Sequence, residues 1–113
     1  MKGKVIIDGH EYPVAFNLST LIAFEQTAGH SFMEDDFGSF LSRAIIIWAA
    51  MFSADDSVKT DAVIKSGDWQ GISDAYVRVM NLAADFFHVP GIVEEAERKE
   101  SPSTDDAANE KNA

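Results

Sequence analysis

Three histidines are the residues of this chain best suited to acid–base or metal chemistry, because its 113 residues include no cysteine. His10 falls in a predicted turn, His30 in a predicted loop and His88 near the end of a helical pattern. No two of them have the i, i+4 spacing that puts two ligands on one helix face, and none lies in a known metal-ligand motif. We interpret them as surface and turn residues and predict neither a metal nor another cofactor.

A run of carboxylates, Glu34-Asp35-Asp36, is the second candidate for chemistry. A metal site would need further ligands, and no second ligand set is visible in the sequence. The alternative is an acidic helix start, where negative charge complements the helix dipole. We favour this alternative. The chain also lacks a nucleophile elbow, a phosphate-binding loop and a zinc-protease motif, so we predict that the protein is not an enzyme.

The elements around these residues begin with a predicted two-strand hairpin. Asp8-Gly9 suits a two-residue type I′ turn, in which both central residues need positive φ. In the register set by this turn the apolar side chains share one face, namely Val5, Ile7, Tyr12, Val14 and Phe16, with Lys2, Lys4 and Glu11 on the other. Pro13 blunts the outer edge of the second strand, so we predict that the first strand, Lys2 to Ile7, has the open edge.

The rest of the pattern predicts about four helices packed on this hairpin, an α+β fold. The first begins near Asn17 or Ser19 and ends before Gly29, with an inner stripe of Leu18, Leu21, Ile22 and Ala28. Phe32-Met33 then folds back on the hairpin or the first helix. A second helix is expected from about Phe37 to Phe52, and a short third one from Ser57 or Thr60 to about Lys65.

The last predicted helix begins at Asp68 and stops at Val89-Pro90-Gly91. Its apolar residues recur at helical spacing, which predicts a stripe facing the core: Trp69, Ile72, Tyr76, Val79, Met80, Ala83, Phe86 and Phe87. Residues 1–92 are therefore expected to form a single domain. From residue 93 the chain is rich in glutamate and poor in large apolar residues, so 93–113 is predicted to be a disordered acidic tail.

The second helix is the best candidate for a partner surface, because it is apolar on nearly every side from Ala44 to Phe52. Such a helix is either central in its domain or presents a face to a partner. Burial is the default interpretation, and the alternative assigns partner binding to Trp48, Met51 and Phe52. Lys4 and Ile6, on the predicted open strand edge, are the other two candidate partner-binding residues.

The net charge of −10 argues against two classes of partner. Phosphate backbones and anionic lipid surfaces are repelled by a protein of this charge, so we expect neither nucleic acid nor membrane as a partner. No apolar run approaches the roughly 20 residues that cross a bilayer, and the N-terminus does not resemble a signal peptide. We therefore expect a cytoplasmic protein.

The order of these features resembles the small tail assembly chaperones of long-tailed bacteriophages and prophages. The resemblance covers residues 4–90 and rests on short patterns. These are an Asp-Gly hairpin ending in Tyr-x-Val-x-Phe, a helix ending in Phe-Glu-x-x-x-Gly, an apolar helix before a polar break, and a short helix that starts at threonine. Here they fall at Ile6–Phe16, Leu21–Gly29, Ile45–Asp56 and Thr60–Ile64.

This resemblance implies a non-enzymatic role in building the phage tail. Members of the family are thought to coat the tape-measure protein and to recruit tail-tube subunits, in the cytoplasm of the bacterial host, until polymerisation begins. The alternative is another small phage structural or interaction protein, either a head–tail connector or an inhibitor of a host protein. Other small phage head–tail proteins share the hairpin-plus-helix organisation. The sequence also leaves open whether the chain forms a homo-oligomer.

Overall fold

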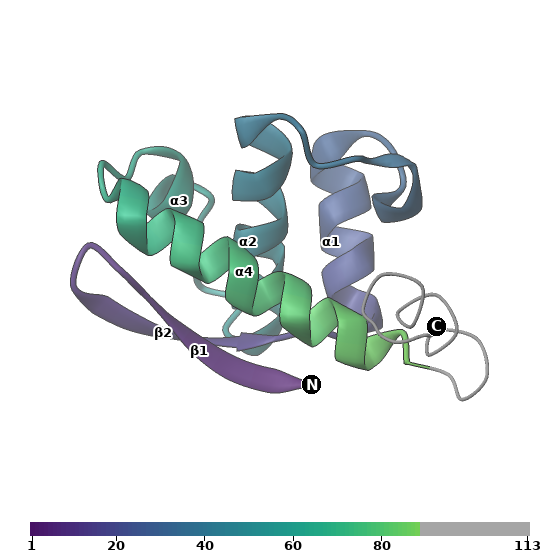
Figure 1. Cartoon of the computed structure of the whole chain (residues 1–113), viewed down its shortest axis with the longest axis horizontal. Helices are drawn as coiled ribbons and strands as arrows, with labels where there is room; N and C mark the ends of the chain where they lie inside the picture. Colours follow the sequence, from purple (N-terminus) through teal and green to yellow (C-terminus); the bar gives the residue numbers. More distant parts are fainter. Residues whose placement is uncertain (89–113) are drawn as a thin grey trace, which may run out of the picture. The chain divides into compact units, whose positions relative to one another are not determined.

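The computed structural model describes residues 1–88, which form a two-stranded antiparallel hairpin followed by helices (Figure 1). The elements are β1 (Lys2–Ile7), β2 (His10–Ala15), α1 (Leu18–Ala28), the 3-10 helix η1 (Phe32–Glu34), α2 (Phe40–Ala54), α3 (Asp61–Ile64) and α4 (Trp69–Phe86). The predicted α+β fold, a hairpin packed against about four helices, is confirmed. The predicted helix stop at Val89-Pro90-Gly91, the domain boundary at residue 92 and the acidic tail lie outside the described residues.

The chain divides into two units, of which the first, Met1–Ala83, is compact, and the second begins at Ala84. The first unit contains the hairpin and most of the helical structure. In the second, the described residues are 84–88, which include the end of α4. There the rings of Phe86 and Phe87 meet edge to face at 5.1 Å between centroids. Phe87 follows the last residue of α4, so it lies just beyond the helix to which the sequence assigned it.

The hairpin has the predicted turn and register. Asp8 and Gly9 both have positive φ, 55° and 77°, as a type I′ turn requires. Ile7 pairs with His10, Val5 with Tyr12 and Gly3 with Val14. The predicted inner face is buried at Val5, Ile7, Val14 and Phe16, whereas the side chains of Lys2, Lys4 and Glu11 are exposed.

Helix α1 has the predicted ends but a different inner face. Asn17 caps its start through a hydrogen bond from the Ser19 N–H, and Gly29 ends it with φ 85°. The predicted stripe is wrong at Leu18 and Ile22, which are exposed, whereas Leu21 and Ala28 are half-buried. The buried residues of the helix are Thr20, Ala23 and Phe24. Thr20 accounts for the rotation. Its hydroxyl donates to the Ala15 carbonyl at 2.9 Å and bonds to the Ser53 hydroxyl at 2.8 Å, which turns this face of the helix inward.

Helix α2 begins three residues later than predicted. Phe37 is not helical but has a φ of 57°, in the left-handed region that a bulky residue seldom occupies. Ser39 caps the helix instead, accepting a hydrogen bond from the Ser42 N–H at 3.0 Å. The predicted acidic helix start is therefore wrong. Asp35 and Asp36 bond to the backbone N–H groups of Phe37 and Gly38, before the helix begins.

The apolar second half of α2 is at the centre of the first unit, where it contacts α1, α3 and β2 (Figure 1). Its buried residues are Ile45, Ile46, Ile47, Ala49, Ala50 and Met51. The default interpretation of this helix, burial inside the domain, is confirmed for these six residues. Phe32 joins the same core through ring contacts with Phe16 and Phe24, as the sequence predicted, but Met33 beside it is exposed.

Helix α3 is a single turn, and Thr60 before it makes no capping hydrogen bond through its side chain. Helix α4 begins at Trp69, after Asp68, whose side chain accepts a hydrogen bond from the Gly71 N–H at 3.0 Å. The predicted stripe of α4 is buried at Val79 and Ala83, but Trp69 is 62% exposed and does not belong to the core. The buried residues of α4 are Ala75, Val79, Leu82 and Ala83, so its first turn extends beyond the core.

Candidate functional site: an apolar groove between α2, α3 and α4

Large apolar side chains gather on one part of the surface, where the first turns of α2 and α4 lie beside α3. Ten such side chains are exposed in residues 1–88, and five of them line this region: Phe40, Leu41, Ile64, Trp69 and Val77. Single exposed apolar residues are normal on a protein surface, but contiguous ones mark a site of interaction. We call this region the apolar groove.

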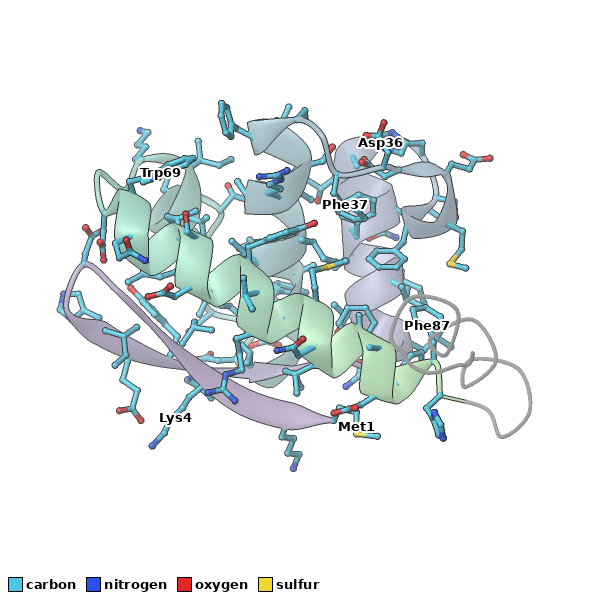
Figure 2. The ribbon with its side chains drawn as sticks, viewed as in Figure 1. Met1, Lys4, Asp36, Phe37, Trp69 and Phe87 are labelled. Atoms are coloured by element: carbon cyan, nitrogen blue, oxygen red, sulfur yellow. The ribbon has the colours of Figure 1, made fainter. Side chains whose placement is uncertain are left out.

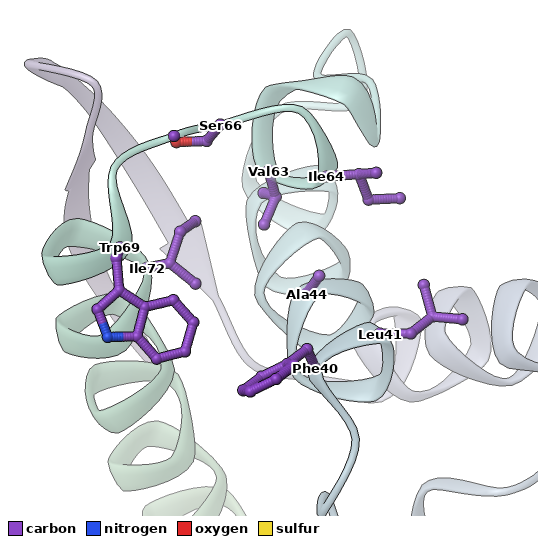
Figure 3. Close-up of a pocket in the computed structure, with 9 residues that line it drawn as sticks. Phe40, Leu41, Ala44, Val63, Ile64, Ser66, Trp69 and Ile72 are labelled. Atoms are coloured by element: carbon purple, nitrogen blue, oxygen red, sulfur yellow. The ribbon is translucent and has the colours of Figure 1, made fainter.

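The apolar groove consists of two adjoining hollows of about 400 and 200 Å³. Phe40, Trp69 and Ile72 line both of them. Phe40 and Trp69 face each other from α2 and α4 (Figure 3), with their rings edge to face and their centroids 5.4 Å apart. The larger hollow is completed by Leu41, Ala44, Val63, Ile64, Ser66 and Gly67, and the smaller by Arg43, Ser73, Tyr76 and Val77.

Two capping residues position the aromatic pair. Phe40 is the first residue of α2 and follows its cap Ser39, while Trp69 is the first residue of α4 and follows Asp68. A residue in the first turn has few helical neighbours of its own to pack against, so its side chain is free to reach a neighbouring element. Figure 2 shows Trp69 at the start of α4. The groove thus depends on where these two helices begin.

Arg43 is the charged residue in the lining of the groove, and it is held by its neighbours. Its Nε donates to the Phe37 carbonyl at 2.6 Å, and its guanidinium lies 5.1 Å from the centroid of the Tyr76 ring. Partial burial raises the pKa of the Tyr76 hydroxyl, while the nearby Arg43 charge acts in the opposite direction. Tyr76 is therefore neutral at physiological pH.

The three predicted partner-binding residues of α2 differ in how deeply they are buried. Met51 is fully buried, so it offers no surface to a partner in this structure. Trp48 and Phe52 are half-buried, and the centroids of their rings lie 4.9 Å apart. The indole N–H of Trp48 donates to the Val58 carbonyl at 2.9 Å, which ties α2 to the segment before α3. None of the three lines the apolar groove.

Lys4 and Ile6 are exposed on β1, with Lys4 pointing away from the helices (Figure 2) and 3.3 Å from a carboxylate oxygen of Glu11. The strand edge beside them is less open than predicted. The Ile6 carbonyl oxygen lies 2.9 Å from where a Cβ on Gly71 would be, and the Asp8 N–H donates to Asp68 at 2.9 Å. The start of α4 thus covers this edge near the turn, because Gly71 lacks a side chain that would keep it away.

The residues first considered for chemistry form one cluster, at His30. The Nε2 of His30 lies 2.6 Å from Oδ2 of Asp35, and the same oxygen accepts a hydrogen bond from the Ser42 hydroxyl at 2.7 Å. These bonds, the one to His30 foremost, lower the pKa of the Asp35 carboxyl. Ser42 and His30 bond to the same oxygen rather than to each other, so the cluster lacks the serine–histidine bond of a hydrolase. It anchors the loop between η1 and α2.

The other candidates for chemistry stay apart. His10 packs its ring near that of Tyr12 in the hairpin, and His88 lies after the end of α4. Within residues 1–88, no three side chains of histidine, aspartate or glutamate come close enough together to hold a metal ion. No helix in this part of the chain is long and apolar enough to cross a membrane.

Sequence reasoning missed the apolar groove, although one signal was present. Phe40-Leu41 begins a helix with two adjacent large apolar residues, and Trp69 begins another with an aromatic one. A helix stripe that starts in the first turn can extend past the core, and the exposed aromatic then belongs to a surface.

Comparison of the chain with protein-family models, with curated proteins and with solved structures finds no match.

Proposed function

We propose that this protein is a non-enzymatic tail assembly chaperone of a bacteriophage or prophage, which binds the tape-measure protein and tail-tube subunits in the cytoplasm of the bacterial host. The observation that carries the proposal is the apolar groove. A chaperone of this kind needs an exposed apolar surface for its client, and half of the exposed large apolar side chains of residues 1–88 line this one groove.

Three further observations support the proposal. The hairpin and the capped α1 that follows it occupy the first two of the four stretches on which the resemblance to tail assembly chaperones rests. The net charge of −10 keeps a protein soluble while it holds an apolar client. The only cluster that joins a serine, a histidine and a carboxylate in residues 1–88 bonds the serine to the carboxylate and anchors a loop, so the arrangement favours binding over catalysis.

The test is co-expression of the full chain with the tape-measure and tail-tube proteins encoded near its gene. We expect the tape-measure protein to stay in the soluble fraction and to co-purify with the chain, and to precipitate when the chain is left out. Purified phage particles should lack the chain, because a chaperone is released on assembly. If mass spectrometry finds it in mature particles in fixed stoichiometry, the protein is a structural component such as a connector.

A further inference from the structure

We propose that the smaller hollow of the apolar groove binds the C-terminal carboxylate of a partner polypeptide whose last side chain is large and apolar. The carboxylate bonds to the guanidinium of Arg43, and the last side chain lies against Phe40 and Trp69. This inference goes beyond the proposed function, because it assigns a ligand chemistry to one hollow and does not depend on which protein carries the chain end. It is carried by the polar groups of the hollow, by its apolar walls and by its size.

Arg43 has more hydrogen-bond donors than its neighbours use. A guanidinium carries five N–H donors, of which the Nε–H donates to the Phe37 carbonyl at 2.6 Å. The two Nη groups bond to no acceptor in residues 1–88, and Arg43 takes part in no ion pair there. The Asp35 carboxylate does not take up these donors, because it is bonded to His30 and Ser42 instead. Paired N–H groups on a guanidinium are the arrangement that binds both oxygens of a carboxylate.

Two hydroxyl groups belong to the same lining. Ser73 and Tyr76 lie on α4, are half-buried and line the smaller hollow together with Arg43. Neither hydroxyl bonds to another group of residues 1–88. Partial burial raises the pKa of Tyr76, so its hydroxyl keeps its proton and can donate to an anion. The smaller hollow therefore combines one cation with two hydroxyl donors, a set that suits a carboxylate.

The walls of the hollow are apolar and fit the side chain of the same terminal residue. They are formed by Phe40, Trp69, Ile72 and Val77, and the first three also line the larger hollow. A terminal residue carries its carboxylate and its side chain on one Cα, so it can place the first at Arg43 and the second where the two hollows adjoin. Burial of this side chain contributes to binding and keeps water from the ion pair, which strengthens it.

Size and charge favour a chain end over other anions. The smaller hollow has about 200 Å³, less than the roughly 300 Å³ at which pockets for whole small molecules begin. A segment with an acidic side chain in its middle must also pass its backbone out on both sides, whereas a chain end enters once. The net charge of −10 opposes a phosphate group, with its nearly two negative charges, more than a carboxylate with one.

The experiment adds short peptides to the ¹⁵N-labelled full-length chain and follows its NMR spectrum. The first peptide is acetyl-glycyl-glycyl-phenylalanine with a free C-terminus, and the second is the same peptide with a C-terminal amide. We expect the first to shift the indole N–H of Trp69 and the Nε–H of Arg43. The amide should bind at least tenfold more weakly, because a hydrogen bond to a charged group contributes about 1.5–3 kcal/mol and tenfold corresponds to about 1.4 kcal/mol.

Two further peptides separate the parts of the proposal. One has a free C-terminus but three glycines, so it lacks the apolar side chain. The other carries its carboxylate on an internal glutamate beside phenylalanine and ends in an amide. We expect both to bind more weakly than the first peptide. Equal binding of the acid and the amide, or no shift with any peptide, overturns the proposal. Equal binding of the glycine peptide refutes the apolar wall, and equal binding of the glutamate peptide refutes the chain end.

A matched pair of variants locates the carboxylate. Arg43→Gln and Lys65→Gln each remove one positive charge beside the groove, but Lys65 is exposed and lies 3.6 Å from Asp61. We expect Arg43→Gln to lose at least tenfold in affinity for the first peptide, and Lys65→Gln to bind as the wild type does. Equal affinities of the two variants overturn the proposal, because a general effect of charge would then account for the binding.

A second variant covers the case in which Arg43→Gln does not fold, since Arg43 also bonds to the Phe37 carbonyl. Ser73→Ala combined with Tyr76→Phe removes both hydroxyls but keeps the arginine and the aromatic ring. Circular dichroism checks that it is folded. We expect its affinity for the first peptide to fall about threefold to tenfold, and the preference for the acid over the amide to shrink. An unchanged preference in this double variant shows that the carboxylate binds elsewhere and overturns the proposal.

Discussion

One carboxylate oxygen of Asp68 accepts a hydrogen bond from the backbone N–H of Asp8 at 2.9 Å, which joins the start of α4 to the turn of the hairpin. The other oxygen accepts a hydrogen bond from the Gly71 N–H at 3.0 Å and caps the helix. Both bonds favour the charged carboxylate and lower the pKa of Asp68. The residue that follows is Trp69, so the hairpin turn helps to position one wall of the apolar groove.

Replacing Asp68 with alanine should therefore loosen the hairpin turn and the first turn of α4 together. We expect a lower midpoint of urea denaturation and faster amide hydrogen exchange at Asp8 and Gly71, whose N–H groups lose their acceptor. Asp74→Ala is the control, because Asp74 is an exposed carboxylate on the same helix that bonds to the Gln70 side chain. Equal effects of the two substitutions would show that Asp68 has no special role.

Gly71→Ala tests how closely α4 approaches β1. An added Cβ would lie against the Asp68 carboxylate and 2.9 Å from the Ile6 carbonyl oxygen, which belongs to the backbone and cannot rotate away. The first turn of α4 must then shift, although alanine is the better helix former by about 1 kcal/mol. We expect net destabilisation in urea denaturation. Gly67→Ala is the matched control, since nothing lies within 4 Å of its added Cβ, and it should leave the stability unchanged or slightly higher. A stabilised Gly71→Ala protein would contradict the close approach.

Asp35 makes the stability of the fold depend on pH in the acidic range. Its hydrogen bonds to His30, Ser42 and the Phe37 N–H lower its pKa below the usual 3.8. A carboxyl whose pKa is lower in the folded state stabilises the fold above its unfolded pKa, and this contribution is lost as the pH falls through the folded value. Asp35→Asn should therefore be less stable than the wild type near neutral pH, and the difference should shrink below about pH 4.

Urea denaturation at several pH values measures this difference directly. Asp36→Asn is the control, because it removes one charge from the same loop at an exposed carboxylate next in the chain. A stability difference between Asp35→Asn and wild type that stays constant down to pH 3 would show that these hydrogen bonds do not hold the charged form.

Local features of this fold could be predicted from the sequence, because they depend on residues close together in the chain. The turn chemistry of Asp8-Gly9 and the alternation of β1 and β2 specify the hairpin register, and Asn17 and Gly29 bound α1. The face that α1 buries was not predictable in this way. It is decided by Thr20 and its bonds to Ala15 and Ser53, and Ser53 lies 33 residues away.

The candidate site could not be predicted for the same reason. Its lining comes from three separate helices, and no sequence pattern shows that the first turns of α2 and α4 will lie together. The start of α2 depends on Phe37, whose positive φ is maintained by bonds at both its N–H and its carbonyl. A helical pattern that includes Phe37 gives no sign of this constraint. Apolar periodicity also marks Trp69 as buried, since it cannot show where a helix leaves the core.

Thr20 itself allows a test of the tertiary constraint on α1. It is fully buried, donates to the Ala15 carbonyl, bonds to the Ser53 hydroxyl and accepts from the Asn17 N–H. Thr20→Val keeps the shape but removes all three bonds and leaves buried polar groups without a partner, so we expect a loss of roughly 1–3 kcal/mol in unfolding free energy. Thr27→Val, at an exposed position of the same helix, should change the stability by less than about 0.5 kcal/mol. Comparable losses in the two variants would contradict the assigned role of Thr20.

Truncation of the two tryptophans should affect stability and client binding to different extents. Trp48 is half-buried, packs on Phe52 and donates to the Val58 carbonyl, so Trp48→Ala should lower the unfolding free energy by about 2–4 kcal/mol. Trp69 is 62% exposed and contacts Phe40 at the surface, so Trp69→Ala should lower it by less than about 1 kcal/mol. Urea denaturation followed by far-ultraviolet circular dichroism measures both, and it does not depend on the fluorescence of the residue removed. Client binding should show the reverse order, with Trp69→Ala the more damaging of the two among molecules that remain folded. A large loss of stability on Trp69→Ala would place this side chain in the core and remove the apolar groove as a binding surface.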